Sequence, residues 1–119
     1  GSKRKMIKIV IRKEPTGSIN SLDIKGHSGY AEAGKDIICS AVSATAYMAA
    51  GALEELAGLR NCHCEKDGHM VISLPRDMAP DKRSTADIIF KAAAIGFRQI
   101  EFSYGKYVLV VEEEVQSHD

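Results

Sequence analysis

A histidine and a cysteine in the segment from Gly26 to Ser43 have residue types and a spacing that suit nucleophilic chemistry. His27 ends a predicted strand, and Cys39 lies in the first turn of a predicted helix. A helix N-terminus stabilises a thiolate, the reactive form of cysteine, through its unpaired N–H groups and the helix dipole. A histidine within reach takes the thiol proton and returns it to a leaving amine. We therefore interpret Cys39 as a candidate nucleophile and His27 as its base.

Both residues also have an ordinary structural interpretation. Cys39 stands in an apolar run, where cysteine is commonly a small buried side chain, and His27 can equally be a surface residue at a strand end. Two supporting candidates share this ambiguity. Asp36 is the predicted N-cap of the helix and can also orient His27. Ser43 follows Cys39 by one turn, so it either reaches the site or packs as a small residue.

The loop between His27 and Cys39 is bounded by Gly29 and Gly34 and contains Tyr30. Glycines permit backbone conformations that other residues avoid, so such a loop can rearrange. We interpret it as a lid over the substrate, with an ordinary flexible surface loop as the alternative. Its spacing does not match a Walker or dinucleotide phosphate-binding motif.

A second group of possible ligands, Cys62-His63-Cys64 with His69, raises a metal site as an alternative. Cys62 and Cys64 would share one face of a strand, and His69 would come from the paired strand. The two-residue gap between the cysteines of zinc knuckles is missing, however. We predict no metal and no cofactor, and we expect these side chains at exposed or half-buried strand positions.

Periodicity and turn signals predict the elements that position these residues. Two strands come first, at 6–13 and 19–27, and the second has room for a bulge. A helix follows, from its cap at Asp36 to a stop at Gly58. Two further strands at 61–66 and 69–74 are joined by the turn Asp67-Gly68, and they are followed by a helix from Ser84 or Thr85 to about Tyr104 and a strand at 107–111.

Helical spacing predicts one apolar face on each helix. For the first helix these positions are Ile38, Val42, Thr45, Ala46, Ala49, Leu53 and Leu56. For the second they are Ile88, Ile89, Ala92, Ile95 and Ile100, and we favour continuation through Gly96.

The order ββαββαβ predicts a single α+β domain over residues 6–113, with the helices packed on one mixed sheet. Residues 1–5 are expected to be a lead-in that begins with a cloning remnant, Gly1-Ser2, and residues 114–119 to be the end of an acidic, frayed tail that begins at Glu112.

Composition narrows the class of protein. Sixteen basic and sixteen acidic side chains give no net charge, which argues against nucleic-acid binding by bulk electrostatics but leaves a local patch open. No signal-peptide pattern is recognisable, and no apolar run is expected to span a bilayer. Three cysteines, an odd number, indicate a reducing cytoplasm without a disulfide framework.

The same segment resembles the signature of the Prp family, the bacterial ribosomal-processing cysteine proteases. The matching runs are Gly26-His27-Ser28, Gly34-Lys35-Asp36-Ile37-Ile38-Cys39 and Ala41-Val42-Ser43-Ala44, and Leu53 to Leu59 resembles the end of the family's helix. Two departures, Ile38 for the usual Val and Ser40 where Ala is common, remove no reactive group. The resemblance covers nearly the whole chain after the first few residues.

This resemblance implies a cysteine endopeptidase with Cys39 as nucleophile, His27 as base and Asp36 in support. The implied substrate is the N-terminal extension of large-subunit ribosomal protein twenty-seven, which is cleaved after a pair of aromatic residues. The resemblance also implies a homodimer. From the charge balance, the cysteines and the lack of a spanning segment, we expect a cytoplasmic protein without direct nucleic-acid or membrane contact. Two alternatives are a non-catalytic ribosome-associated binding module and a redox-sensing thiol protein.

Overall fold

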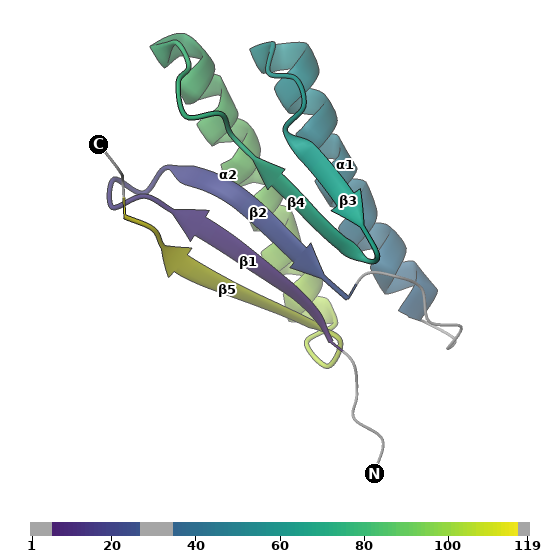
Figure 1. The fold of residues 1–119 in the computed structure, drawn as a ribbon. Coiled ribbons are helices and arrows are strands. Elements are labelled where there is room, and N and C mark those ends of the chain that lie inside the picture. The colour runs from purple at the N-terminus through teal and green to yellow at the C-terminus, as the bar shows by residue number, and fades with distance from the viewer. Residues whose placement is uncertain (1–5, 27–34, 117–119) are drawn as a thin grey trace.

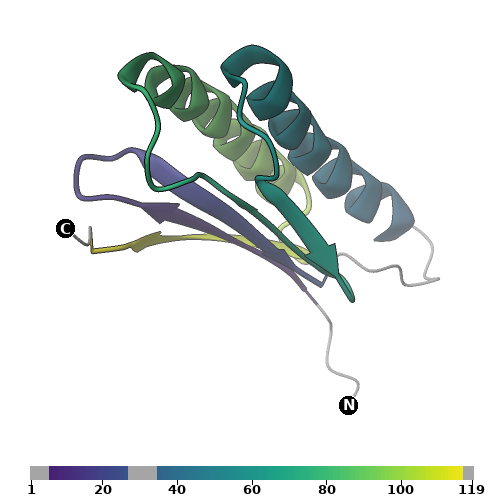
Figure 2. The same cartoon turned by 45° about the horizontal axis from the view of Figure 1, so that its top comes forward.

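A computed structural model describes residues 6–26 and 35–116 of the chain. The elements are β1 (Ile7–Lys13), β2 (Ile19–Lys25), α1 (Lys35–Ala57), β3 (His63–Lys66), β4 (His69–Ser73), α2 (Pro80–Ser103) and β5 (Val108–Glu114). The strands form one sheet in the order β3-β4-β2-β1-β5, in which only β1 and β5 run parallel. Both helices cover the same face of this sheet (Figures 1 and 2). The predicted ββαββαβ order and the α+β class are confirmed.

The two hairpins form where the turn residues predict them. Gly17 donates its N–H to the carbonyl of Glu14 at 2.8 Å in the first turn. In that hairpin Arg12 pairs with Ser21 but Lys13 pairs with Ile19, so Asn20 is the extra residue of the expected bulge. In the second turn Asp67 and Gly68 have φ values of 53° and 79°, as a two-residue turn with both central residues left-handed requires.

The core lies between the sheet and the two helices. Ile7, Ile9 and Ile11 alternate along β1 toward the helices and are at most 5% exposed. A Cβ added at Gly96 would lie 3.3 Å from the Thr45 Cγ2 atom, so the glycine permits close packing of α2 on α1. This contact explains why a glycine stands inside α2, which continues through Gly96, as predicted, to Ser103.

The predicted start of α2 is wrong. The helix begins at Pro80, because proline suits the first helical position, where its missing N–H has no partner to lose. Ser84 and Thr85 lie inside the helix, where their hydroxyl groups donate to the carbonyls of Pro80 and Asp81 at 3.1 Å each. They therefore bond backward within the helix and do not cap it.

The predicted apolar face of α2 is also largely wrong. Ile88 and Ile95 are 70% and 60% exposed, and Ala92 is exposed as well. The buried face instead consists of Ala86, Ile89, Phe90, Ala93, Ala94 and Phe97. The two large aromatic rings fill the space above the sheet, so they fix which side of the helix faces the core.

Three smaller expectations need correction. Leu56 of α1 is 71% exposed rather than buried. The final strand runs on to Glu114, since Glu112, Glu113 and Glu114 pair in register with β1, so the acidic segment is not frayed from Glu112. By length and composition the segment Ile37–Ala57 is apolar enough to cross a membrane, with a mean hydropathy of 1.4. A helix packed in a core can have the same composition, and α1 contributes seven buried side chains to the core: Ile38, Cys39, Val42, Ala46, Ala49, Leu53 and Ala57.

Candidate active site

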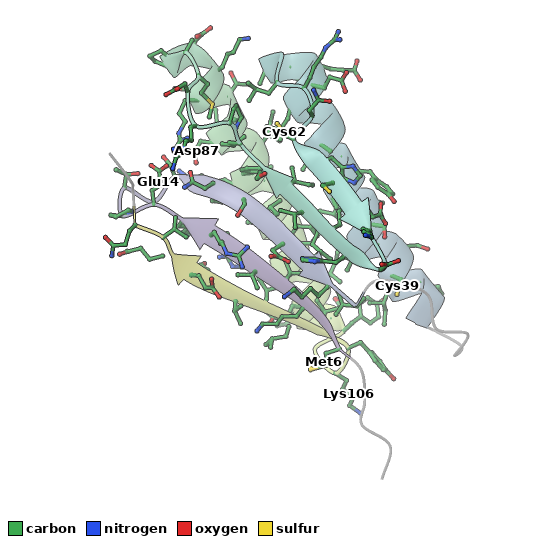
Figure 3. All side chains as sticks on the ribbon, viewed as in Figure 1. Met6, Glu14, Cys39, Cys62, Asp87 and Lys106 are labelled. Atoms are coloured by element: carbon green, nitrogen blue, oxygen red, sulfur yellow. The ribbon has the colours of Figure 1, made fainter. Side chains whose placement is uncertain are left out.

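The end of β2 and the start of α1 lie at the same end of the molecule. Figure 3 shows Cys39 at this end together with Met6 and Lys106, and Glu14 and Asp87 at the opposite end. The nucleophile candidate and the strand that leads to His27 are therefore brought to one edge of the domain. This arrangement is what the sequence interpretation requires of the two elements.

Gly26 fixes the direction in which the chain leaves β2. Its φ is +86°, and its N–H donates to the carbonyl of Gly68 at 3.1 Å. A Cβ at this position would lie 2.8 Å from the Met6 carbonyl oxygen, closer than real Cβ contacts come. Only glycine tolerates both the left-handed φ and this approach. The backbone is therefore determined up to the residue that precedes His27.

Cys39 is the fifth residue of α1, since the helix begins at Lys35. It thus opens the second turn, not the first as predicted. Cα–Cβ bonds in a helix tilt toward its N-terminus, so the thiol is directed back over the first turn, whose N–H groups have no partner within the helix. Cys39 is 9% exposed and belongs to the core cluster.

The two supporting candidates occupy the same end of α1. Asp36 lies within the first turn and does not precede the helix, so the predicted N-cap role is wrong. The side chain of Asp36 lies outside the described residues. Ser43 is half-buried, one turn after Cys39.

The remaining predicted site residues lie outside the described part of the chain. These are His27, Gly29, Tyr30 and Gly34. The distance between His27 and the Cys39 thiol, and the role of the loop as a lid, therefore stay predictions.

Sequence reasoning missed a polar group beside α1. The Tyr47 hydroxyl donates to Glu65 Oε1 at 3.1 Å, and its ring meets His63 edge-on at 5.8 Å. The hydrogen bond to Glu65 raises the pKa of Tyr47 above its ordinary value. Tyr47 and His63 also line a pocket of about 290 Å³ between α1 and the segment before β3, with Gly51 and Glu54 on its helical side. The only signal in the sequence was a tyrosine two turns after Cys39 in an alanine-rich run.

The other two thiols have different surroundings. Cys62 is buried, and burial raises its pKa above the ordinary value. Cys64 is exposed on β3. Within residues 6–26 and 35–116, no cluster of three or more His, Cys, Asp or Glu side chains has the arrangement of a metal site.

Comparison with known proteins identifies sequence relatives of this chain. A family model described as "Cysteine protease Prp" matches residues 6–109. The ribosomal processing cysteine protease Prp of Bacillus subtilis (strain 168) is 29% identical over 101 residues, which cover 83% of this chain and 90% of that protein.

Solved structures with the same fold are also known. The essential ribosomal processing protease Prp from S. aureus, in complex with a substrate peptide, matches with a TM-score of 0.79 and 22% identity, over 91% of this chain and 100% of that one. SMU.848 from Streptococcus mutans matches with a TM-score of 0.80 and 26% identity, over 93% of this chain and 97% of that one. The first of these similarities bears on the fold alone.

Proposed function

Since this chain belongs to the Prp family of cysteine proteases, we propose that it is a cysteine endopeptidase that removes the N-terminal extension of large-subunit ribosomal protein twenty-seven during ribosome assembly. The observation that carries the proposal is the family match over residues 6–109, which includes both reactive candidates. The position of Cys39 near the start of α1 supports it. So does the substrate peptide bound to the S. aureus relative, because it makes a peptide the expected ligand class.

The proposed mechanism is acyl transfer. His27 takes the proton from the Cys39 thiol, and the thiolate sulfur attacks the carbonyl carbon of the scissile peptide bond. The C–N bond then breaks, the amine leaves with the proton from His27, and a thioester remains. Water hydrolyses the thioester and restores the thiol. Unpaired N–H groups of the first turn of α1 stabilise the oxyanion of each tetrahedral intermediate.

The other candidate residues have secondary roles in this proposal. Asp36 orients His27 or holds the loop, and Ser43 lines the site beside Cys39. The loop that contains Gly29, Tyr30 and Gly34 closes over the bound peptide. The enzyme is a cytoplasmic homodimer that needs no cofactor.

The test is mass spectrometry of the extended ribosomal protein after incubation with the enzyme. We expect loss of the N-terminal extension with the wild type, and no cleavage with Cys39→Ala, because alanine suits a helix and removes the nucleophile. Cys64→Ala is the matched control, since it removes an exposed thiol and should cleave normally. Normal turnover by folded Cys39→Ala would contradict the assignment of the nucleophile.

One observation favours the non-catalytic alternative, in which Cys39 is a buried core residue of a ribosome-associated binding module. Cys39 is only 9% exposed. A limiting dose of iodoacetamide at mildly acidic pH distinguishes the two cases, because a thiolate at a helix start reacts before ordinary thiols. Peptide mapping should find Cys39 labelled first, and an aromatic-pair peptide should protect it. Labelling of Cys64 with Cys39 untouched would favour the inert cysteine, and reversible oxidation without peptidase activity would favour the redox sensor.

A further inference from the structure

The face of the sheet opposite the helices carries a row of basic side chains that crosses four strands. Lys66 of β3 lies opposite His69 of β4, His69 lies opposite Lys25 of β2, and Lys25 lies opposite Lys8 of β1. Because Ile7 and Ile9 of β1 point into the core, Lys8 points to the opposite face. With adjacent strands about 4.8 Å apart, the four residues span about 14 Å. We call these four residues the basic row.

The basic row breaks a rule of sheet stability. Like charges directly opposite each other on neighbouring strands destabilise a sheet. Within the described residues, no carboxylate lies within ion-pair distance of Lys8, Lys25 or Lys66. Five other basic residues do have such partners: Arg12 with Asp23 and Glu113, Lys13 and Arg98 with Glu112, Arg83 with Glu14, and Lys91 with Asp87. Local conflicts of this kind are expected at functional sites.

One member of the row is held in place by a buried carboxylate. His69 donates its Nε2 proton to Asp23 Oδ1 at 2.6 Å, and Arg12 donates from Nη1 to Asp23 Oδ2 at 2.8 Å. The Asp23 side chain is 8% exposed, whereas that of His69 is 43% exposed. Asp23 therefore orients His69 while leaving the ring accessible, and its charge is shared with Arg12.

The surroundings of the row indicate which kind of anion fits it. The next cross-strand row on the same face contains Val71, Asp23, Val10 and Val111, and Leu109 lies opposite Lys8. None of these side chains is aromatic, so this part of the described face offers no platform on which bases stack. Lysines without aromatic neighbours bind the phosphate backbone, which fixes position without reading sequence.

From these observations we propose that the basic row binds the phosphodiester backbone of RNA. The proposal rests on the proposed function, because a ribosomal protein under assembly is presented next to ribosomal RNA. The row lies at the end of the sheet that β1 enters and β2 leaves, the end at which Figure 3 places Cys39, but on the face away from α1. An RNA held there leaves the site near Cys39 open for the peptide. The neutral net charge, from which no direct nucleic-acid contact was expected, does not oppose a local row of this kind.

The test measures binding of a fluorescein-labelled oligouridylate by fluorescence anisotropy at several salt concentrations. With three phosphates neutralised by lysines, the slope of log K against log salt should be about −2.1, so a change from about 50 to 200 mM salt weakens binding roughly 18-fold. The row variant Lys8→Gln/Lys25→Gln/Lys66→Gln should lose most of the affinity and the slope. The control variant Arg60→Gln/Lys82→Gln/Lys91→Gln removes the same charge from exposed sites elsewhere and should bind like the wild type.

Several outcomes would overturn the proposal. Equal weakening by both variants would show a general charge effect, and absence of binding by the wild type at 50 mM salt would show no site. Equally tight binding of polyglutamate would point to an acidic protein, and a changed molecular mass of the row variant in light scattering would make this face an interface between two copies.

Two further readouts separate this proposal from the proposed function. Release of like-charge repulsion should raise the melting temperature of the row variant. A cooperative thermal transition also shows that this variant folds. Both variants should cleave a short peptide at the wild-type rate. If no protein cleaves it, the protease assignment fails, while the RNA measurement still decides the row.

Discussion

Gly26 offers a test of how the fold positions His27, because Gly17 provides a matched control. Both glycines have a left-handed backbone, with φ of +86° and +95°. A Cβ at Gly17 would meet nothing within 4 Å, whereas at Gly26 it would lie 2.8 Å from a backbone oxygen of Met6. Alanine at either position carries the same φ penalty of about 1–2 kcal/mol. The difference between the two variants in free energy of unfolding therefore reports the clash with the Met6 backbone alone.

The extra cost at Gly26 follows from the atom that must move. The Met6 oxygen belongs to the backbone at the start of β1, so relief requires a shift of the strand or of the β2 end. Overpacking of this kind costs about 1–3 kcal/mol. We expect Gly26→Ala to be less stable than Gly17→Ala by about 2 kcal/mol, or about 1 M in the urea midpoint for an m value near 2 kcal/mol/M.

The activity measurement asks whether the shift reaches His27. A displacement of a catalytic group by about 1 Å can cost about a hundredfold in rate. At a temperature where both variants are folded, we expect kcat/KM of Gly26→Ala to fall at least about tenfold and that of Gly17→Ala to stay within about twofold of the wild type. Equal urea midpoints would refute the steric argument. Full activity of a destabilised Gly26→Ala would refute the positioning of His27 by this turn.

Three further predictions concern packing, helix propensity and pH. Phe97→Ala should lower the free energy of unfolding by about 3–5 kcal/mol and Ile95→Ala by less than about 0.5 kcal/mol, because only the phenylalanine is buried. Comparable losses for the two variants in urea unfolding would contradict the side of α2 that faces the core. Gly51→Ala should raise the melting temperature, since nothing lies within 4 Å of its Cβ and alanine favours a helix by about 1 kcal/mol. Burial raises the pKa of Asp23, but hydrogen bonds from Arg12 and His69 outweigh it and hold the pKa below the ordinary 3.8. Asp23 therefore contributes to the free energy of unfolding above pH 3.8, and this contribution is lost as the pH falls through the lowered pKa. When the free energy of unfolding is measured against pH, Asp23→Asn should lose less stability than the wild type over this acidic range. The same acid dependence in both proteins would argue against the ion pair.

The parts of the fold that could be predicted are those with strong local signals. The pair Asp67-Gly68 requires a left-handed turn, and the alternation along β1 fixes which residues face the helices. The side of α2 that faces the core could not be predicted in this way, because isoleucines occur on both sides of the helix. The large rings of Phe90 and Phe97 decide which side is buried, because they fill the space above the sheet. That space exists only once the helix and the sheet are packed together.

The candidate site shows the same division. Residue spacing and the family motif both predicted Cys39 as the nucleophile, and the predicted helix that carries it is present. The expected cap at Asp36 was misplaced by two residues, since the helix already begins at Lys35, which is within the usual uncertainty of a helix end. Tyr47 and Glu65 could not have been paired from sequence, because their hydrogen bond joins α1 to a strand after an intervening turn. The basic row was equally hidden, since its members come from four strands whose order only the structure gives.

The pairing of β1 with β5 has a consequence for how the protein is made. The two strands join opposite ends of the chain, and the ion pair between Arg12 and Glu113 spans 101 residues of sequence. During synthesis β1 can pair with β2 at once, but its other edge stays open until the last strand has left the ribosome. An unpaired edge is a template for another chain, and contacts this distant in sequence form slowly. A chain that stops before Val108 therefore leaves β1 as an exposed edge strand, so a chain interrupted at that stage of translation is especially prone to aggregate.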